Sequence, residues 1–514
     1  MDQRTWFPKQ IIADQVFSKD DLESMWNAID WADVRESVFR QQCDIARAAL
    51  EGDGAGISRL QDELVNSDDA KALAVWEVVH RKSRATPGVD GVVWETPAQR
   101  MSAALHLNNE GYESLPLLRF FIPKESGKLR PIGIPTMHDR AMQMLYNFAL
   151  QPVAETWGDP HSFGYRLFRS AKDACAAIRS FLAGEQGDDI WVLDADITGC
   201  FDNIRHDWLL KHIPVSRDYL RQVLKSGYIH ESRYFRTSRG IPQGGIISPV
   251  LANMTLDGLE PRLMKAFSRP VDTTDDRQAA GAGLRYVRYA DDFVVLSSAR
   301  GVLEEAWDEI NAFLKPRGLT LSDEKTRIVS VRHGFTFLHW RFRKEGSDIP
   351  VRPSDGSVHH MRQILKELFG SRPFSNPDEL IQQFNPLLRG YAFYHRDVEA
   401  GELFRSLDEC IREKILALLS CWFPNESRES LEGRFFSCGE GGLPVFNTTT
   451  QSLYLLTETP LRMHQGLEPN LNAFLDRDRL MHREEQGDPL DRAVYRERIK
   501  SREEGRKYGV PEYW

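Results

Sequence analysis

Apolar side chains recur at helical spacing along the first eighty residues. Between residues 29 and 50 they include Ile29, Val34, Val38 and Ile45, which share one face of a helix with 3.6 residues per turn. Residues 58–79 continue the pattern. We therefore predict helices here and interpret residues 1–80 as a helical N-terminal extension rather than a catalytic core.

The pattern then changes to short strands. The stretch LPLLRFFIPKESGKLRPIGIP, residues 115–135, is typical of two strands around a turn that contains glycine and carries positive charge. We expect a basic finger at this point, because its lysines lie at the turn. Residues 136–183 favour helix again.

From residue 190 the order of elements indicates one sheet. Residues 190–197 alternate, so that Asp194 and Asp196 fall on one face of a strand. A helix at 200–213, a glycine-rich loop that enters a helix near Pro249, a hairpin at 287–296, an amphipathic helix and further strands follow. This order predicts an α+β fold with a split βαβ unit, an antiparallel sheet covered by helices on one face.

Two adjacent acids interrupt the apolar hairpin VRYADDFVVL. Repulsion and desolvation both oppose placing Asp291 next to Asp292 inside a strand. In the predicted sheet they lie beside Asp196, and hard oxygen ligands without histidine or thiolate are typical of a Mg²⁺ site that accepts substrate phosphates. Taken alone, the pair is equally compatible with a hairpin turn of no chemical consequence.

The chain resembles a known family over roughly residues 25–480. The segments that carry the resemblance, in chain order, are SRATPGVDGVVWETP, FFIPKESGKLRPIGIPTMHDRA, SFGYRLFRSAKDA, DADITGCFDNIRH, GIPQGGIISPVLANM, RYADDFVVL, LSDEKTRIV, FTFLHWRF and NPLLRGYAFYHR. They are similar to the motif blocks of group II intron reverse transcriptases and maturases. YADD within this set is highly specific, whereas the downstream maturase segments match more weakly.

The resemblance implies a metal site and a reaction. Asp196, Asp291 and Asp292 match the metal-binding aspartates of the family, and the carbonyl of Ile197 would be a further ligand. The implied cofactors are two Mg²⁺ ions, with Mn²⁺ as a possible substitute. Lys325 matches a lysine that would protonate the pyrophosphate leaving group; an exposed lysine at a strand end is the alternative.

The resemblance also implies contacts to the incoming deoxynucleoside triphosphate. Lys124 and Arg130 match finger residues that clamp the triphosphate. Phe201 matches the steric gate against a ribose 2′-hydroxyl, where a bulky wall rejects the extra group. Gln243 and Gly244 match the loop beneath the nucleotide and the template base.

The implied architecture is a right-hand polymerase with fingers, palm and helical thumb. We expect fingers with the start of the palm at 81–190, the palm with the aspartates at 191–345, and a helical thumb or maturase domain at 346–440. Residues 441–514 are expected to hold a possible degenerate DNA-binding segment and a charged tail. No Cys/His cluster follows residue 440, so we expect no HNH endonuclease.

Composition limits the class of protein. The chain has 514 residues, of which 41% are hydrophobic and 27% charged, which is typical of a globular protein. It shows no signal peptide and no apolar stretch long enough to span a membrane, so we expect a cytoplasmic protein. Six scattered cysteines indicate neither disulfides nor zinc.

Charge leaves the biological role open. With 66 basic and 75 acidic residues the net charge is −9, whereas extensive RNA binding favours a basic balance. Three hypotheses remain: an intron-type reverse transcriptase with an RNA template, a DNA or RNA primer and a structured RNA partner; an intron-independent reverse transcriptase in antiphage defence or DNA repair; and a non-catalytic RNA-binding splicing factor. The oligomeric state is not predicted.

Overall fold

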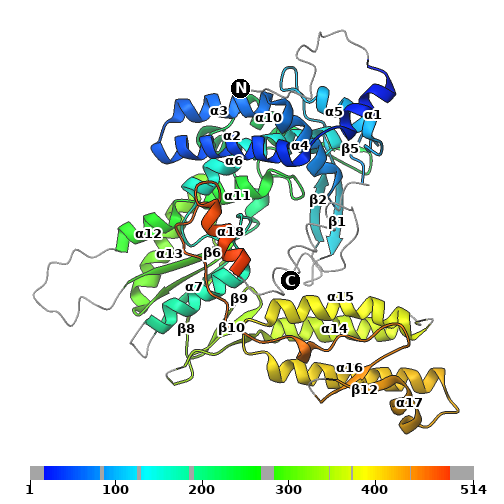
Figure 1. Ribbon diagram of the computed structural model, residues 1–514. Coiled ribbons are helices and arrows are strands. Elements are labelled where there is room, and N and C mark those ends of the chain that lie inside the picture. Colours follow the sequence, from blue (N-terminus) through cyan, green and yellow to red (C-terminus); the bar gives the residue numbers. More distant parts are fainter. Residues whose placement is uncertain are drawn as a thin grey trace, which may run out of the picture.

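A computed structural model describes residues 17–81, 86–123, 129–184, 190–267, 283–346, 348–371, 374, 376–439 and 442–486. Figure 1 shows three tiers: the N-terminal helices in blue, a central sheet with its helices in green, and the C-terminal helices in yellow and orange. Across these residues no helix is both long enough and apolar enough to span a membrane.

The N-terminal helices pack around one long helix, α6 (Met137–Trp157), which contacts α2, α3 and α4. Helix starts follow from local sequence, since the carboxylate of Asp30 accepts backbone N–H groups at the start of α2 and the hydroxyl of Thr136 does the same for α6. The helices predicted up to residue 80 are thus confirmed where described. They are α1 (Lys19–Asn27), α2 (Trp31–Glu51), α3 (Gly54–Asn66) and α4 (Asp68–Val79), followed by α5 (Pro97–Leu105).

The expected finger is an antiparallel hairpin of β1 (Leu117–Pro123) and β2 (Leu129–Ile134). Its tip, residues 124–128, lies outside the described residues. β1 also pairs in parallel with β4 (Tyr228–His230), which pairs with β5 (Arg233–Phe235). The hairpin is therefore one half of a four-stranded sheet of order β2-β1-β4-β5.

The central sheet has the order β6-β7-β3-β8, with every neighbouring pair antiparallel. β6 and β7 form the expected hairpin, and β7 lies beside β3. The register places Ala195 of β3 opposite Phe293 of β7. The strands are β3 (Trp191–Ala195), β6 (Arg285–Tyr289), β7 (Asp292–Ser297) and β8 (Arg327–Ser330).

This sheet separates two hydrophobic cores. Leu193 and Val295 belong to a core shared with α6 and the N-terminal helices, and α13 (Arg300–Leu314) contacts the sheet on this side. Val192 and Val294 belong to a second core, shared with α7 (Ala171–Gly184) and the C-terminal helices. The helical cover expected on one face of the sheet therefore extends to the other face through α7.

Helices dominate the chain after the central sheet. A small sheet of order β11-β10-β9 leads into them. These elements are β9 (Phe335–Phe337), β10 (Trp340–Phe342), β11 (Val351–Pro353), α14 (Asp355–Ser371), α15 (Pro377–His395), α16 (Gly401–Trp422), α17 (Arg428–Phe435), β12 (Phe436–Cys438), β13 (Pro444–Phe446) and the 3₁₀ turn η3 (Leu456–Glu458).

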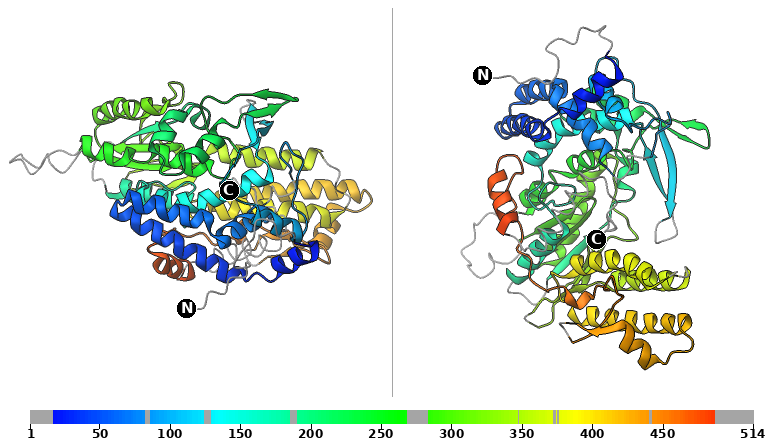
Figure 2. Two further views of the ribbon diagram at one scale, coloured as in Figure 1. Left: turned by 90° about the horizontal axis from the view of Figure 1, so that it is seen from above. Right: turned by 45° about the vertical axis from the view of Figure 1, so that its right-hand side comes forward.

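The C-terminal segment 461–483 returns to the first tier. It includes most of α18 (Arg477–Gln486), which is red in Figure 2. The ring of Phe474 stacks on Phe39 of α2, with centroids 6.0 Å apart. On the way the segment contacts α7, where the carboxylate of Asp173 accepts hydrogen bonds from the backbone of Leu467 and from the guanidinium of Arg483. The stretch expected to be a DNA-binding region is thus packed against the rest of the chain.

A short loop supports the edge of the central sheet at β6. The N–H of Arg288 donates to the carbonyl of His161, and the N–H of Phe163 donates to the carbonyl of Arg288, both at 2.9 Å. Gly164 follows directly and lies against the hairpin turn, because a Cβ added there would lie 2.4 Å from the backbone nitrogen of Ala290. The turn therefore requires glycine at position 164.

Replacing Gly164 with alanine tests this packing. We expect Gly164→Ala to lower the free energy of unfolding by about 1–3 kcal/mol, because overpacking of a tight site costs that much. Gly301→Ala is the matched control, since a Cβ there meets nothing within 4 Å and the residue is helical. Chemical denaturation of both variants measures the difference; equal stability of the two would contradict the packing argument.

Candidate active site

The two adjacent aspartates lie at the tip of the β6–β7 hairpin. Tyr289 pairs with Asp292, so Ala290 and Asp291 are the two central residues of the turn. Ala290 has a φ of +58°, in the left-handed region that residues other than glycine rarely adopt. Asp291 is half-buried and Asp292 is exposed. The turn thus presents two carboxylates on a strained backbone.

Asp196 follows the last residue of β3. Because Ala195 pairs with Phe293 in an antiparallel ladder, extending the register by one residue places Asp196 opposite Asp292. Residues directly opposite in such a ladder have Cβ atoms about 5 Å apart. The carbonyl of Asp196 accepts a hydrogen bond of 2.8 Å from Ser322, which fixes its backbone. The sheet therefore brings together the strand end and the hairpin that the sequence analysis predicted to meet.

The neighbouring carboxylates affect the pKa of Asp292. The pKa of Asp292 is raised to about 7, first by desolvation, then by the charges of Asp291 and Asp196. Solvent reaches the side chain, but the surrounding protein removes part of its hydration. Asp194, two residues before Asp196, pairs with Arg327 at 3.2 Å. The site is thus an acidic end of the sheet.

Lys325 lies directly at this acidic end. Its Nζ lies 3.0 and 3.1 Å from the two carboxylate oxygens of Asp196, and 67% of its side chain is exposed. The ammonium group therefore supplies one positive charge beside the carboxylates. Its exposure leaves the side chain accessible from solvent, as a group that meets a substrate requires.

Within the described ranges, no group of three or more His, Cys, Asp or Glu side chains is arranged to hold a metal ion. Ile197, expected to offer its carbonyl, is buried and bridges to Leu321. Hard oxygen donors of like charge nevertheless fit a divalent cation, which would relieve the repulsion that raises the pKa of Asp292.

Three of the residues expected to contact a nucleotide, Phe201, Gln243 and Gly244, lie on one loop or in direct contact with it. The carbonyl of Phe201, a half-buried residue of α8 (Cys200–Asn203), accepts a hydrogen bond of 2.7 Å from Ile241. The side chain of Gln243 donates to the carboxylate of Asp202 at 3.2 Å. The carbonyl of Gln243 accepts a hydrogen bond of 2.7 Å from Gly133 of β2. The loop thus joins the helix after Asp196 to the finger hairpin.

Gly244 shows why this loop needs glycine. Its φ is +110°, and a Cβ there would lie 2.7 Å from the carbonyl oxygen of Gly133. Arg130, on the same strand as Gly133, is exposed and pairs across the hairpin with Ile122. Lys124 lies outside the described residues. The structure thus connects the strand of Arg130 to the loop of Gln243 and Gly244.

Sequence reasoning missed Arg288, which precedes the turn by two residues. Its side chain is fully buried, and its guanidinium donates to the carbonyl of Ala290 at 3.2 Å. A signal was present, because an arginine at an inward position of the strand RYVRY requires a buried partner.

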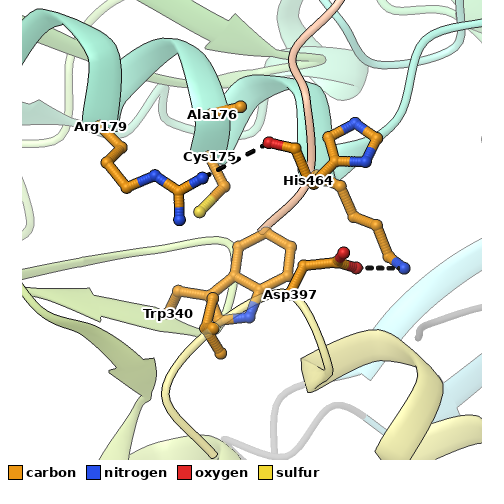
Figure 3. Close-up of a pocket in the computed structure, with 8 residues that line it drawn as sticks. Cys175, Ala176, Arg179, Trp340, Asp397 and His464 are labelled. Carbon is orange, nitrogen blue, oxygen red and sulfur yellow. Dashed lines mark hydrogen bonds and ion pairs between the residues drawn. The ribbon is translucent and has the colours of Figure 1, made fainter. Parts of the chain in front are cut away.

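A small cavity lies elsewhere, between α7, β10 and the C-terminal segment (Figure 3). It has room for about one water molecule. The Nζ of Lys172 lies 2.5 Å from the carboxylate of Asp397, and Arg179 donates to the carbonyl of His464. Burial lowers the pKa of Lys172 to about 8, against the influence of Asp397. None of the acidic residues of the hairpin lines this cavity, so it is a packing junction apart from the site.

Three family models match the chain. Residues 122–342 match "Reverse transcriptase (RNA-dependent DNA polymerase)", residues 26–107 match "N-terminal domain of reverse transcriptase", and residues 358–435 match "Group II intron, maturase-specific domain". The first includes the central sheet and the loop of Gln243. None of the three describes a nuclease.

Similar proteins occur in Escherichia coli, Lactococcus lactis and Euglena gracilis. Protein YkfC of Escherichia coli (strain K12) is 30% identical over 346 residues, which are 60% of this chain and 89% of YkfC. The group II intron-encoded protein LtrA of Lactococcus lactis subsp. cremoris is 28% identical over 56% of this chain and 54% of its own length. The chain thus spans about half of LtrA. Maturase-like protein 1 of Euglena gracilis is 22% identical over 73% of this chain and 79% of its own.

A solved telomerase from Candida albicans, in complex with the TWJ fragment of telomeric RNA, aligns with a TM-score of 0.36 at 13% identity, over 61% of this chain and 58% of its own. That similarity is too low for a conclusion about this chain. The three family models and the similarity to YkfC, together with the α+β fold, are enough to assign the chain to a family. The chain belongs to the group II intron-type family of reverse transcriptases and maturases.

Proposed function

We propose that this protein is an RNA-directed DNA polymerase that extends a DNA or RNA primer on an RNA template. The observation that carries the proposal is the register of β3 against β7, which sets Asp196 opposite Asp292 at the tip of a hairpin that also holds Asp291. The register thus brings two distant parts of the sequence that carry these carboxylates to one end of a sheet. The match of residues 122–342 to the reverse transcriptase model supports the same reaction.

Asp196, Asp291 and Asp292, with the carbonyl of Ile197, would hold two Mg²⁺ ions, or Mn²⁺ in their place. Bound there, the metal ions supply activation of the primer 3′-hydroxyl and stabilisation of charge on the pyrophosphate leaving group. Lys325, paired with Asp196, has the position and the exposure to donate a proton to that pyrophosphate.

The loop of Gln243 and Gly244, which is hydrogen-bonded to α8 and to β2, would form the nucleotide site. The ring of Phe201 would stand against the ribose and exclude a 2′-hydroxyl, while Gln243 and Gly244 would lie beneath the base. Arg130, with Lys124, would hold the triphosphate from the finger hairpin by charge. The support is that hydrogen bonds join Phe201 and Asp202 of α8 to the loop of Gln243, and join that loop to the strand of Arg130.

The helices α14–α17 would bind a structured RNA, because residues 358–435 match the maturase-specific domain. A second candidate function is an intron-independent reverse transcriptase in antiphage defence or DNA repair. The net charge of −9 favours it, since phosphate neutralisation by basic side chains dominates affinity for a large RNA.

Primer extension tests the catalytic assignment. We expect Asp291→Asn to lower the rate of DNA synthesis on a primed RNA template by about 10³-fold or more, because it removes a charge that holds the metal ions. Asp194→Asn is the matched control on the same sheet, and should cost no more than about fivefold, as for a partly exposed ion pair. Equal, background-level synthesis by the native protein and by Asp291→Asn would favour the non-catalytic splicing factor.

The raised pKa of Asp292 predicts a pH dependence of stability. Its folded pKa, about 7, lies above the usual 3.8, so between these values the folded state binds a proton that the unfolded state lacks. Stability of the metal-free protein from this group therefore falls as pH rises from about 4 to about 7. We expect the Tm of Asp292→Asn to fall less than the Tm of the native protein as pH rises from about 4 to about 7. Addition of Mg²⁺ at pH 7.5 should raise the Tm of the native protein only. Parallel Tm curves for both proteins would contradict the assignment.

Substitution of Phe201 tests the nucleotide site. Phe201→Ala should raise the ratio of ribonucleotide to deoxynucleotide incorporation, because it removes the wall beside the ribose. Phe201→Tyr keeps the bulk and serves as the control that retains discrimination. Competition of labelled nucleotides in primer extension measures the ratio; an unchanged ratio in Phe201→Ala would show that the gate lies elsewhere.

A further inference from the structure

A buried guanidinium lies directly behind the acidic hairpin. Arg288 belongs to β6, two residues before the turn, and its side chain is 0% exposed. Burial of a charged group is costly unless the group is paired and hydrogen-bonded. Such a residue on the strand that ends at Asp291 therefore calls for a structural reason.

Its partners join the turn to α11 (Ser248–Leu256). The guanidinium forms a short ion pair with Asp257, the residue after α11. One of its nitrogens also donates to the side-chain oxygen of Asn253 and to the carbonyl of Ala290, both at 3.2 Å. A single planar group thus fixes the backbone of the turn to a helix of the first core.

The turn needs such a restraint. Ala290 has a positive φ, and the carboxylates of Asp291, Asp292 and Asp196 repel one another. Both effects favour a relaxed turn in which the carboxylates move apart. The second contact of Asn253 opposes this movement as well, since its amide donates at 2.8 Å to the carbonyl of Gly164, which packs against Ala290.

We propose that Arg288 is a positioning residue for the metal-binding carboxylates. By holding the carbonyl of Ala290, it keeps Asp291 and Asp292 turned toward Asp196. It touches neither substrate nor metal. The inference rests on the proposed function for the role of the three aspartates, and adds that their arrangement depends on a buried arginine.

The fork of the guanidinium is essential to this role. Arginine reaches Asp257 and the Ala290 carbonyl at once, whereas the ammonium of lysine is a compact charge that cannot reproduce the planar geometry. Arg288→Lys therefore keeps the charge opposite Asp257 and loses the simultaneous hold on the turn. A role limited to charge compensation would be preserved by lysine.

The test compares Arg288→Lys with Arg396→Lys in the full chain. Arg396 is also a fully buried arginine, but it lies over the ring of Phe393 among the C-terminal helices. Binding of Mn²⁺ is measured from the EPR signal of free Mn²⁺, without template or nucleotide, below the Tm of each variant. We expect Arg288→Lys to weaken Mn²⁺ binding by about 10–100-fold, the usual effect of losing a group that orients metal ligands. Arg396→Lys should leave Mn²⁺ binding unchanged.

Hydrogen exchange gives a readout that needs no metal. The amides of residues 287–296 should exchange faster in Arg288→Lys than in native protein or Arg396→Lys. If Arg288→Lys does not fold, the charge-balanced pair Arg288→Met with Asp257→Asn replaces it and should show both effects.

Native Mn²⁺ affinity and native exchange in the Arg288 variant would overturn the proposal. Failure of the native chain to bind Mn²⁺ at a site sensitive to Asp291→Asn would instead overturn the proposed function. Hydrogen exchange of the backbone amides of residues 287–296 would in that case still decide whether Arg288 holds the turn.

Discussion

Repulsion between carboxylates that strand pairing forces together is the constraint on which this molecule depends. β7 lies between β6 and β3, so the hairpin and the end of β3 cannot separate without breaking the β3–β7 ladder. The strands are in turn held by hydrophobic cores on both faces of the sheet. The free energy of folding of the central sheet and its two cores thus keeps the negatively charged carboxylates adjacent. The divalent cations of the proposed function would bring the opposite charge that these carboxylates lack.

Two positively charged side chains lie on opposite sides of the acidic end of the sheet. Lys325 meets the acidic end from the solvent side, while Arg288 supports it from the buried side through the backbone. The first is exposed and able to move, whereas the second is fixed by Asp257. In the proposed function, metal ions would take the place of the exposed lysine at the carboxylates while the buried arginine keeps the shape of the turn.

Much of this could be predicted from the sequence. Period-two alternation at 190–197 and the turn within VRYADDFVVL predicted the strands, and the motif order predicted the family, both confirmed. The roles of Lys124, Arg130, Phe201, Gln243 and Gly244 stay predictions. The strand pattern places Arg288 at an inward position, but its role could not be predicted, because its partner Asp257 is set by tertiary packing. The cover of both sheet faces was missed for the same reason, since α7 packs on the sheet through contacts that no local pattern encodes.

The contact between Cys43 and Phe474 has a consequence for how the protein is made. The thiol of Cys43 donates to a carbonyl 431 residues later in the chain. At a synthesis rate of about 5–20 residues per second, the apolar strip of α2 around Phe39 and Cys43 waits about 20–90 s on the ribosome before its covering segment emerges. During that interval the nascent chain presents an uncovered apolar surface on α2. Completion of the first tier is therefore one of the last events in folding, although its helices are the first to be synthesised.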